Sequence, residues 1–168
     1  MKRAELFVSV LAASFVLGAC GNAIYAEVSG RTGVSPLGDG TFEIYVQTCG
    51  IGVDTLRVAG PNDGGRNEVY GEWKAEDPVT GAFVFNPLSP PEGWQGIQAL
   101  SLPSAPDSLL LIGVGSSTAD AQVYPVDVRI AEILENEPSV IITGSEDSTH
   151  PAAERKLLSR EEFDKCPG

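Results

Sequence analysis

Residues 39–50, "DGTFEIYVQTCG", are the stretch that decides the fold of this chain. Phe42, Ile44 and Val46 alternate with more polar residues, and a period of two places alternate side chains on opposite faces of a β-strand. An Asp-Gly pair precedes the alternation and a Cys-Gly pair follows it, and both pairs are turn signals. The stretch therefore predicts a strand with one face in an apolar core.

The same pattern recurs along the chain. In residues 53–61 and 67–76 the side chains expected to face the core are Leu56, Val58, Val69, Gly71 and Trp73. Residues 108–115, "SLLLIGVG", form a continuous apolar run that is typical of a strand buried on both faces. In residues 122–130, Pro125 cannot donate a ladder hydrogen bond, so it predicts a bulge or a sheet edge. Further strands are expected within residues 81–85, 97–102 and 137–144.

The end of the chain carries one helix signal. Residues 159–166, "SREEFDKC", place Ser159 and Glu162 at the spacing of a capping box. The preceding residues 145–158 are polar and predict a loop. Many short strands with turn signals and almost no helix predict an all-β protein. The first expectation is an immunoglobulin-like β-sandwich of about seven to nine strands with a short C-terminal helix, and a partly open β-barrel is the alternative.

The start of the chain reads as an export signal. Lys2 and Arg3 precede an apolar run over residues 6–17, which spans about 18 Å as a helix and falls short of the ~30 Å hydrocarbon core. Residues 17–20, "LGAC", then resemble the lipobox of bacterial lipoproteins. The resemblance implies that residues 1–19 are removed and that the sulfur of Cys20 receives a diacylglyceryl group.

Lipid chains at Cys20 would hold the protein on the outer side of a bacterial membrane without crossing it. Ordinary secretion with cleavage after Ala26 is the alternative, although Ile24 then stands where a small residue is preferred. Residues 20–40 are expected to be a tether, with a possible edge strand around Val28. Residues 41–168 are expected to form a single domain.

A lipidated Cys20 leaves two cysteines for thiol chemistry. Export places Cys49 and Cys166 in an oxidising compartment, where two thiols usually pair. We therefore predict a Cys49–Cys166 disulfide, with two buried free cysteines as the alternative. The disulfide would stabilise the fold by about 4–5 kcal/mol in the chain-entropy account.

Charge excludes one class of partner. The formal net charge is −12 at pH 7, and such a chain repels phosphate backbones, so nucleic acid is not expected as a partner. The acidic surface is expected to be simply solvated. The alternative is that it binds a cationic partner or divalent metal ions.

No catalytic residue, metal ligand or cofactor site is predicted. His150 is the one histidine and lies in a polar stretch, and residues 113–117, "GVGSS", match neither a nucleophile elbow nor a dinucleotide fingerprint. One histidine and two paired cysteines cannot supply a zinc site. The many carboxylates leave open a hydrolase that uses two of them.

Trp94, in the stretch "PPEGWQG", is the candidate ligand contact, because an aromatic ring on a Pro/Gly-rich loop can stack on a sugar or enter a partner's pocket. The alternative is that its ring covers the core of its own domain. The expected function is a non-enzymatic binding or structural module of the cell envelope, with an envelope protein or polysaccharide as partner. An envelope hydrolase with paired carboxylates is the competing hypothesis.

Overall fold

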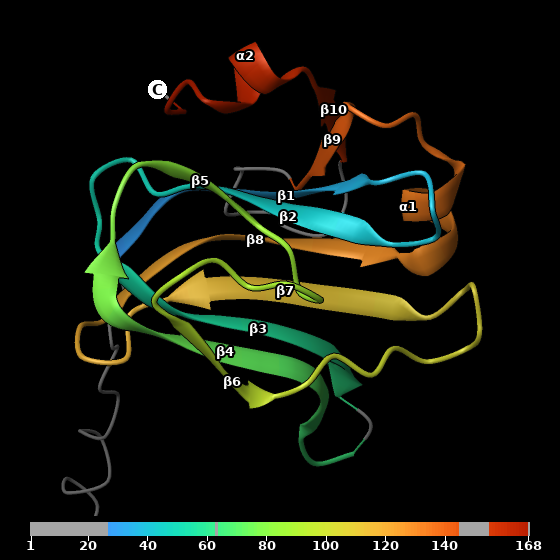
Figure 1. Ribbon diagram of the computed structural model, residues 1–168, viewed down its shortest axis with the longest axis horizontal. Coiled ribbons are helices and arrows are strands. Elements are labelled where there is room, and N and C mark those ends of the chain that lie inside the picture. The colour runs from blue at the N-terminus through green and yellow to red at the C-terminus, as the bar shows by residue number, and fades with distance from the viewer. Residues whose placement is uncertain (1–26, 63, 145–154, 168) are drawn as a thin grey trace, which may run out of the picture.

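The computed structural model describes residues 27–62, 64–144 and 155–167, shown in Figure 1. Within these residues the elements, in chain order, are β1 (Glu27–Pro36), β2 (Phe42–Gln47), β3 (Val53–Asn62), β4 (Asn67–Val79), β5 (Ala82–Phe85), β6 (Trp94–Gln98), β7 (Leu109–Gly115), β8 (Ala121–Arg129), α1 (Ile130–Glu135), β9 (Ile141–Thr143), β10 (Lys156–Leu158) and α2 (Arg160–Phe163). The all-β prediction is confirmed. Helix α1 has no counterpart among the predicted elements.

The ten strands belong to one curled, mixed sheet. Its main order is β5-β2-β1-β8-β7-β3-β4-β6, with β1 and β8 parallel and the other neighbours antiparallel. Beyond the point where β8 leaves β1, β9 pairs with β1 and β10 pairs with β9. This architecture agrees with the partly open barrel rather than with the two sheets of an immunoglobulin-like sandwich, because β1 joins both halves into one sheet.

Closure of the barrel is incomplete between β5 and β6, which in the described part of the chain are joined by side chains and not by ladder pairs. The ring of Trp94 lies 5.1 Å from that of Phe85 and 5.9 Å from that of Phe83, measured between centroids. Trp73 continues the cluster, 5.2 Å from Phe85. These four rings form an aromatic seam between β5 and β6, in place of the missing backbone pairing.

The core fills the concave side of the sheet. Phe42, Ile44 and Val46 of β2 are buried as predicted, as are Leu56 and Val58 of β3. Strand β7 differs from the prediction of burial on both faces, because its residues alternate between buried and half-buried. One face of β7 packs in the core while the other lies on the outside of the barrel, so burial on both faces was wrong.

Two bulges set which side chains face inward. Opposite Gly113, β8 carries both Tyr124 and Pro125, which confirms the bulge predicted from the proline. Tyr70 of β4 is a second extra residue, since Gly71 pairs with Val58 while Val69 pairs with the next residue of β3. Tyr70 consequently packs against the core, and the expected inward position of Val69 was wrong.

Strand β1 differs most from its prediction as a tether with an edge strand. It is a central strand, and its residues from Gly30 to Pro36 are buried. A Cβ on Gly33 would lie 2.4 Å from Ile141 and 2.8 Å from Phe163, so only glycine lets the C-terminal segment pack against this strand. The barrel therefore begins within residues 20–40.

The C-terminal segment β9-β10-α2 covers the outer face of β1 and β2 (Figure 1). Helix α2 has the predicted capping box, in which Ser159 donates its backbone N–H to the Glu162 carboxylate at 2.9 Å and its side chain accepts from the Glu162 N–H. The Gln47 amide donates to the carbonyl of Asp164 at 2.6 Å. Strand β10 lies within the predicted loop 145–158, so that part of the prediction was wrong; residues 145–154 lie outside the described part.

The predicted pairing of Cys49 with Cys166 is confirmed at the level of geometry. Their Cα atoms are 5.6 Å apart and their sulfur atoms lie within disulfide distance. The link joins the residues after β2 to the residues after α2, 117 positions apart. Closing a loop of that length stabilises the fold by about 5 kcal/mol in the chain-entropy account.

Gly30 supports a prediction about the central strand. Its φ is +73°, and a Cβ there would lie 1.9 Å from the carbonyl oxygen of Gln47. We expect Gly30→Ala to lower the free energy of unfolding by about 2–5 kcal/mol, from the left-handed backbone and the steric overlap together. Urea denaturation measures the change.

The matched control is Gly81→Ala, because Gly81 also has a positive φ, +86°, but faces open space. Only the backbone cost of about 1–2 kcal/mol is expected there. Equal losses for the two variants would contradict the close packing of β1 against β2.

Candidate functional site

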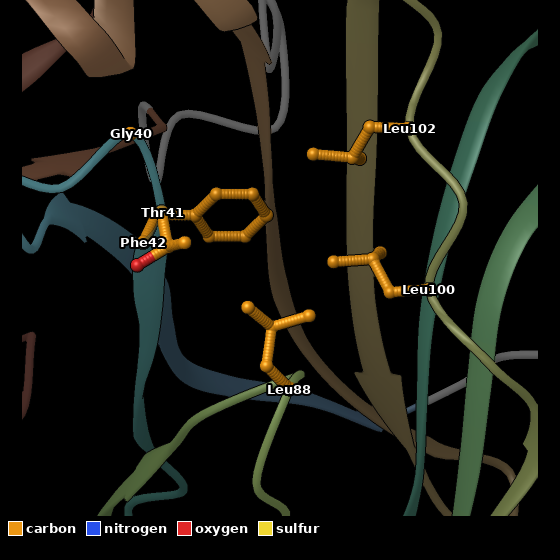
Figure 2. Close-up of a pocket in the computed structure, with 6 residues that line it drawn as sticks. All are labelled: Gly40, Thr41, Phe42, Leu88, Leu100 and Leu102. Atoms are coloured by element: carbon orange, nitrogen blue, oxygen red, sulfur yellow. The ribbon is translucent and has the colours of Figure 1, made fainter.

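An apolar hollow lies at the open part of the barrel (Figure 2). Its volume is about 220 Å³, somewhat larger than the ~150 Å³ apolar cavity that holds a benzene molecule in an engineered protein. The residues that line it come from the start of β2, from the connection between β5 and β6 and from the segment after β6; they are Gly40, Thr41, Phe42, Leu88, Leu100 and Leu102.

The hollow exists because the two sides of the seam diverge. Strand β5 ends where Phe85 pairs with Ile44, so Phe42 extends beyond it. On the other side the chain after β6 stays beside β4, where the N–H of Ser101 donates to the carbonyl of Tyr70 at 2.7 Å. The seam is therefore closed by aromatic rings at one end and open at the other, where the hollow lies.

The lining side chains point toward a common space. Figure 2 shows the ring of Phe42 facing Leu100 and Leu102, with Leu88 approaching from a third side, while the oxygen of Thr41 lies on the side away from the Phe42 ring. Phe42 is buried and Leu88 is 63% exposed, so the hollow has a buried base and an exposed apolar rim. This combination suits a small apolar group that enters from solvent.

A short turn holds Leu88 at the rim. The side-chain oxygen of Asn86 accepts the backbone N–H groups of Leu88 at 2.9 Å and of Ser89 at 3.3 Å. Such a turn costs little to form and orders the backbone on either side of Leu88. Sequence reasoning missed this residue, and the only signal was a leucine among the prolines of "NPLSPPEG".

Asp39 flanks the same rim. Its carboxylate accepts the backbone N–H of Thr41 at 2.9 Å and also the Thr41 hydroxyl. These hydrogen bonds, that of the hydroxyl first, hold the pKa of Asp39 below its ordinary value. The rim therefore carries a negative charge at neutral pH, and the hydroxyl of Thr41 is already engaged outside the hollow.

The structure places Trp94 away from the hollow. Its ring is partly buried in the aromatic seam, against Phe83 and Phe85. This is the arrangement of the alternative, in which the ring covers its own core. A ligand contact by Trp94 stays a prediction.

Asp54 is a buried carboxylate that is fully engaged in hydrogen bonds with Ser117. Its two oxygens accept the backbone N–H of Ser117 at 2.6 Å and the Ser117 hydroxyl at 2.5 Å. Burial on its own raises the pKa of Asp54, but the hydrogen bonds from Ser117 outweigh it, and the pKa lies below its ordinary value. Ser117 thus serves to hold the β7–β8 turn against the start of β3.

Asp127 is a carboxylate whose pKa is raised above its ordinary value. It is half-buried on β8, and burial raises its pKa while the charge of Arg155 opposes the rise. Asp127 pairs with Leu111 of β7, and Leu111 pairs with Ala59 of β3. Because Ala59 is five residues along β3 from Asp54, Asp127 lies roughly 16 Å along the strands from Asp54. Glycosidases place their two carboxyl groups about 5–10 Å apart, so Asp54 and Asp127 do not form such a pair.

A second hollow lies on the outside of the barrel near the β3–β4 hairpin. It is polar, has a volume of about 440 Å³ and includes Arg57, Arg66, Asn62 and Asn67 in its lining. Arg57 is engaged with the carboxylate of Glu72 at 2.8 Å. Both arginines are exposed, so this hollow has no buried charged group that would define a ligand site.

Other candidates give little chemistry. No three His, Cys, Asp or Glu side chains gather as a metal site within the described ranges. Among the helices of the described residues, none is long and apolar enough to cross a bilayer. Cys20 and His150 lie outside the described residues.

No protein family, curated protein or solved structure was found to match this chain.

Asp54 gives a prediction with a defined pH dependence. Asn at this position offers one acceptor to the two donors of Ser117, so we expect Asp54→Asn to lower the free energy of unfolding by about 1–3 kcal/mol at pH 7. Because the folded pKa is lowered, the carboxylate stabilises above its unfolded pKa of about 4 and loses that contribution as the pH falls through the folded value. Wild type and variant should therefore converge at acid pH.

Urea denaturation at a series of pH values from 7 downward measures this difference. Asp39→Asn is the control, because the Asp39 oxygen that accepts from Thr41 is retained in asparagine and the side chain is exposed. Its unfolding midpoint should stay close to that of wild type. A constant gap between Asp54→Asn and wild type at all pH values would contradict the ionised Asp54–Ser117 contact.

Proposed function

We propose that this protein is a lipid-anchored, extracytoplasmic module of the bacterial cell envelope that binds a ligand through the apolar hollow and does no chemistry on it. The observation that carries the proposal is the hollow itself, with a buried base at Phe42 and an exposed rim at Leu88. A small concave apolar site with few polar groups is the usual form of a ligand pocket.

The course of β1 relates the hollow to the proposed anchor. Glu27 begins β1 and Pro36, at its end, pairs with Phe42, so the hollow lies at the end opposite Glu27. Ten residues of strand span about 30 Å. The chain from Cys20 to Glu27 reaches at most about 25 Å when extended. A lipid at Cys20 would hold the Glu27 end near the membrane and direct the hollow away from it.

Lipidation is tested by labelling cells with radioactive palmitate. We expect the wild-type protein to take up label and Cys20→Ser to take up none, because the thioether needs that sulfur. Cys49→Ser is the control and should remain labelled. Globomycin, which inhibits the lipoprotein signal peptidase, should cause a lipid-modified precursor to accumulate. Label on Cys20→Ser, or no label on wild type, would overturn the proposed anchor.

Binding in the hollow is tested with a neutral aromatic probe, benzyl alcohol. Its ring is the size of group that the hollow admits, so we expect the methyl NMR signals of Leu88, Leu100 and Leu102 to shift on titration. The sample is the full-length protein in nanodiscs of zwitterionic lipid. Signals that stay unchanged at millimolar probe would overturn the hollow as a ligand site.

The control pair for this titration uses two leucines of similar exposure. Leu88 is 63% exposed and Leu157, on β10, is 60% exposed. Leu88→Ser should weaken probe binding several-fold, whereas Leu157→Ser should leave it unchanged. Equal weakening by both substitutions would indicate non-specific binding.

A further inference from the structure

We infer that the hollow selects small amphipathic cations, in which a positively charged group, such as an ammonium, is attached to one apolar group. The inference rests on the proposed function of the hollow as a ligand site. It adds the chemical class of the ligand, which the size of the hollow, its lining and the charges around its rim decide together.

Size limits what can enter. A volume of about 220 Å³ exceeds the ~150 Å³ cavity that holds benzene but is smaller than the ~300–1,000 Å³ of pockets that enclose a drug-sized molecule. The hollow therefore takes one ring or one short branched chain. The rest of a larger ligand would stay outside, at the rim.

The lining keeps a charged or polar group out of the hollow. Phe42, Leu88, Leu100 and Leu102 offer only carbon, and the hydroxyl of Thr41 is bound to Asp39 on the side away from the Phe42 ring. A charged group inside would lose its hydration without a charged side chain to replace it. The head of an amphipathic ligand consequently lies at the rim, where solvent and charges are available.

The rim favours one sign of charge. The segments that form the hollow, residues 37–43 and 86–102, contain three carboxylates and no lysine, arginine or histidine. Glu43 faces the outside of β2, where Tyr45 donates to it at 3.4 Å, and Glu92 lies near Glu76, at the other end of the barrel. Asp39 directly precedes Gly40 and Thr41 of the lining, and its hydrogen bonds from Thr41 keep it ionised. The whole chain adds to the same field with a formal charge of −12. A cationic head is attracted to this rim and an anionic head is repelled.

Three probes with the same ring and different charge test the inference. Benzylamine is cationic at pH 7, benzyl alcohol is neutral and phenylacetate is anionic. Titrations follow the leucine methyl signals of the hollow, with the full-length protein in zwitterionic nanodiscs at low salt. We expect benzylamine to bind about three- to tenfold more tightly than benzyl alcohol, and phenylacetate more weakly than either. Half-molar salt should reduce the differences, because it screens the rim.

A pair of variants assigns the preference to the rim. Asp39→Asn retains the oxygen that accepts from Thr41 and removes the charge, so the ratio of benzylamine to benzyl alcohol affinity should fall. Asp77→Asn is the control, because Asp77 is exposed near the end of β4, at the opposite end of the barrel from Phe42. That variant should keep the wild-type ratio.

The outcomes separate the inference from the proposed function. Equal affinity for the three probes, or tightest binding of phenylacetate, would overturn the cation preference and leave the hollow as a binding site. A ratio that falls equally in Asp39→Asn and Asp77→Asn would overturn the assignment to the rim. No shift of the hollow methyl signals with any probe would overturn both.

Discussion

The arrangement of this protein depends on the backbone pairing of β1. One edge of β1 pairs with β2, and the other pairs first with β8 and then with β9. Where a strand has partners along both edges and neighbours packed against its faces, some of its positions leave no room for a side chain. Gly30 and Gly33 meet that requirement, since a Cβ on either would overlap a neighbouring atom. Without these pairings the two halves of the barrel and the C-terminal segment would not be joined.

The C-terminal segment is stable because several weak contacts act on one short stretch. A four-residue helix is not stable in isolation. Helix α2 is fixed by the burial of Phe163, by the bond from Gln47 to the Asp164 carbonyl and by the link from Cys49 to Cys166. Because the same contacts cover the outer face of β1, they also protect the central strand from solvent.

The open seam relates the fold to its proposed role. Backbone pairing that continued from β5 to β6 would have produced a closed barrel filled by its own side chains. Instead aromatic rings close one end, and the strands diverge past Phe85 at the other. An incomplete sheet is thus the reason that an apolar hollow exists in so small a protein. Asp39, beside the lining residues Gly40 and Thr41, adds a negative charge next to it.

The amino-acid sequence by itself determined the features that arise from local periodicity. The alternation of Phe42, Ile44 and Val46, the capping box of Ser159 and Glu162 and the bulge at Pro125 were all predictable, because each depends on neighbouring residues alone. The lipobox resemblance at Cys20 is likewise a local signal, and its consequence stays a prediction.

The tertiary structure decided what depends on residues far apart in the chain. Strand β1 escaped prediction because its glycines and polar residues show no alternation, and its burial comes from Ile141 and Phe163, more than a hundred positions away. The hollow escaped prediction for the same reason, since Phe42 meets Leu88 and Leu100 only when the sheet curls. Local sequence sets the faces of a strand, whereas long-range pairing sets which strands, and which gaps, come together.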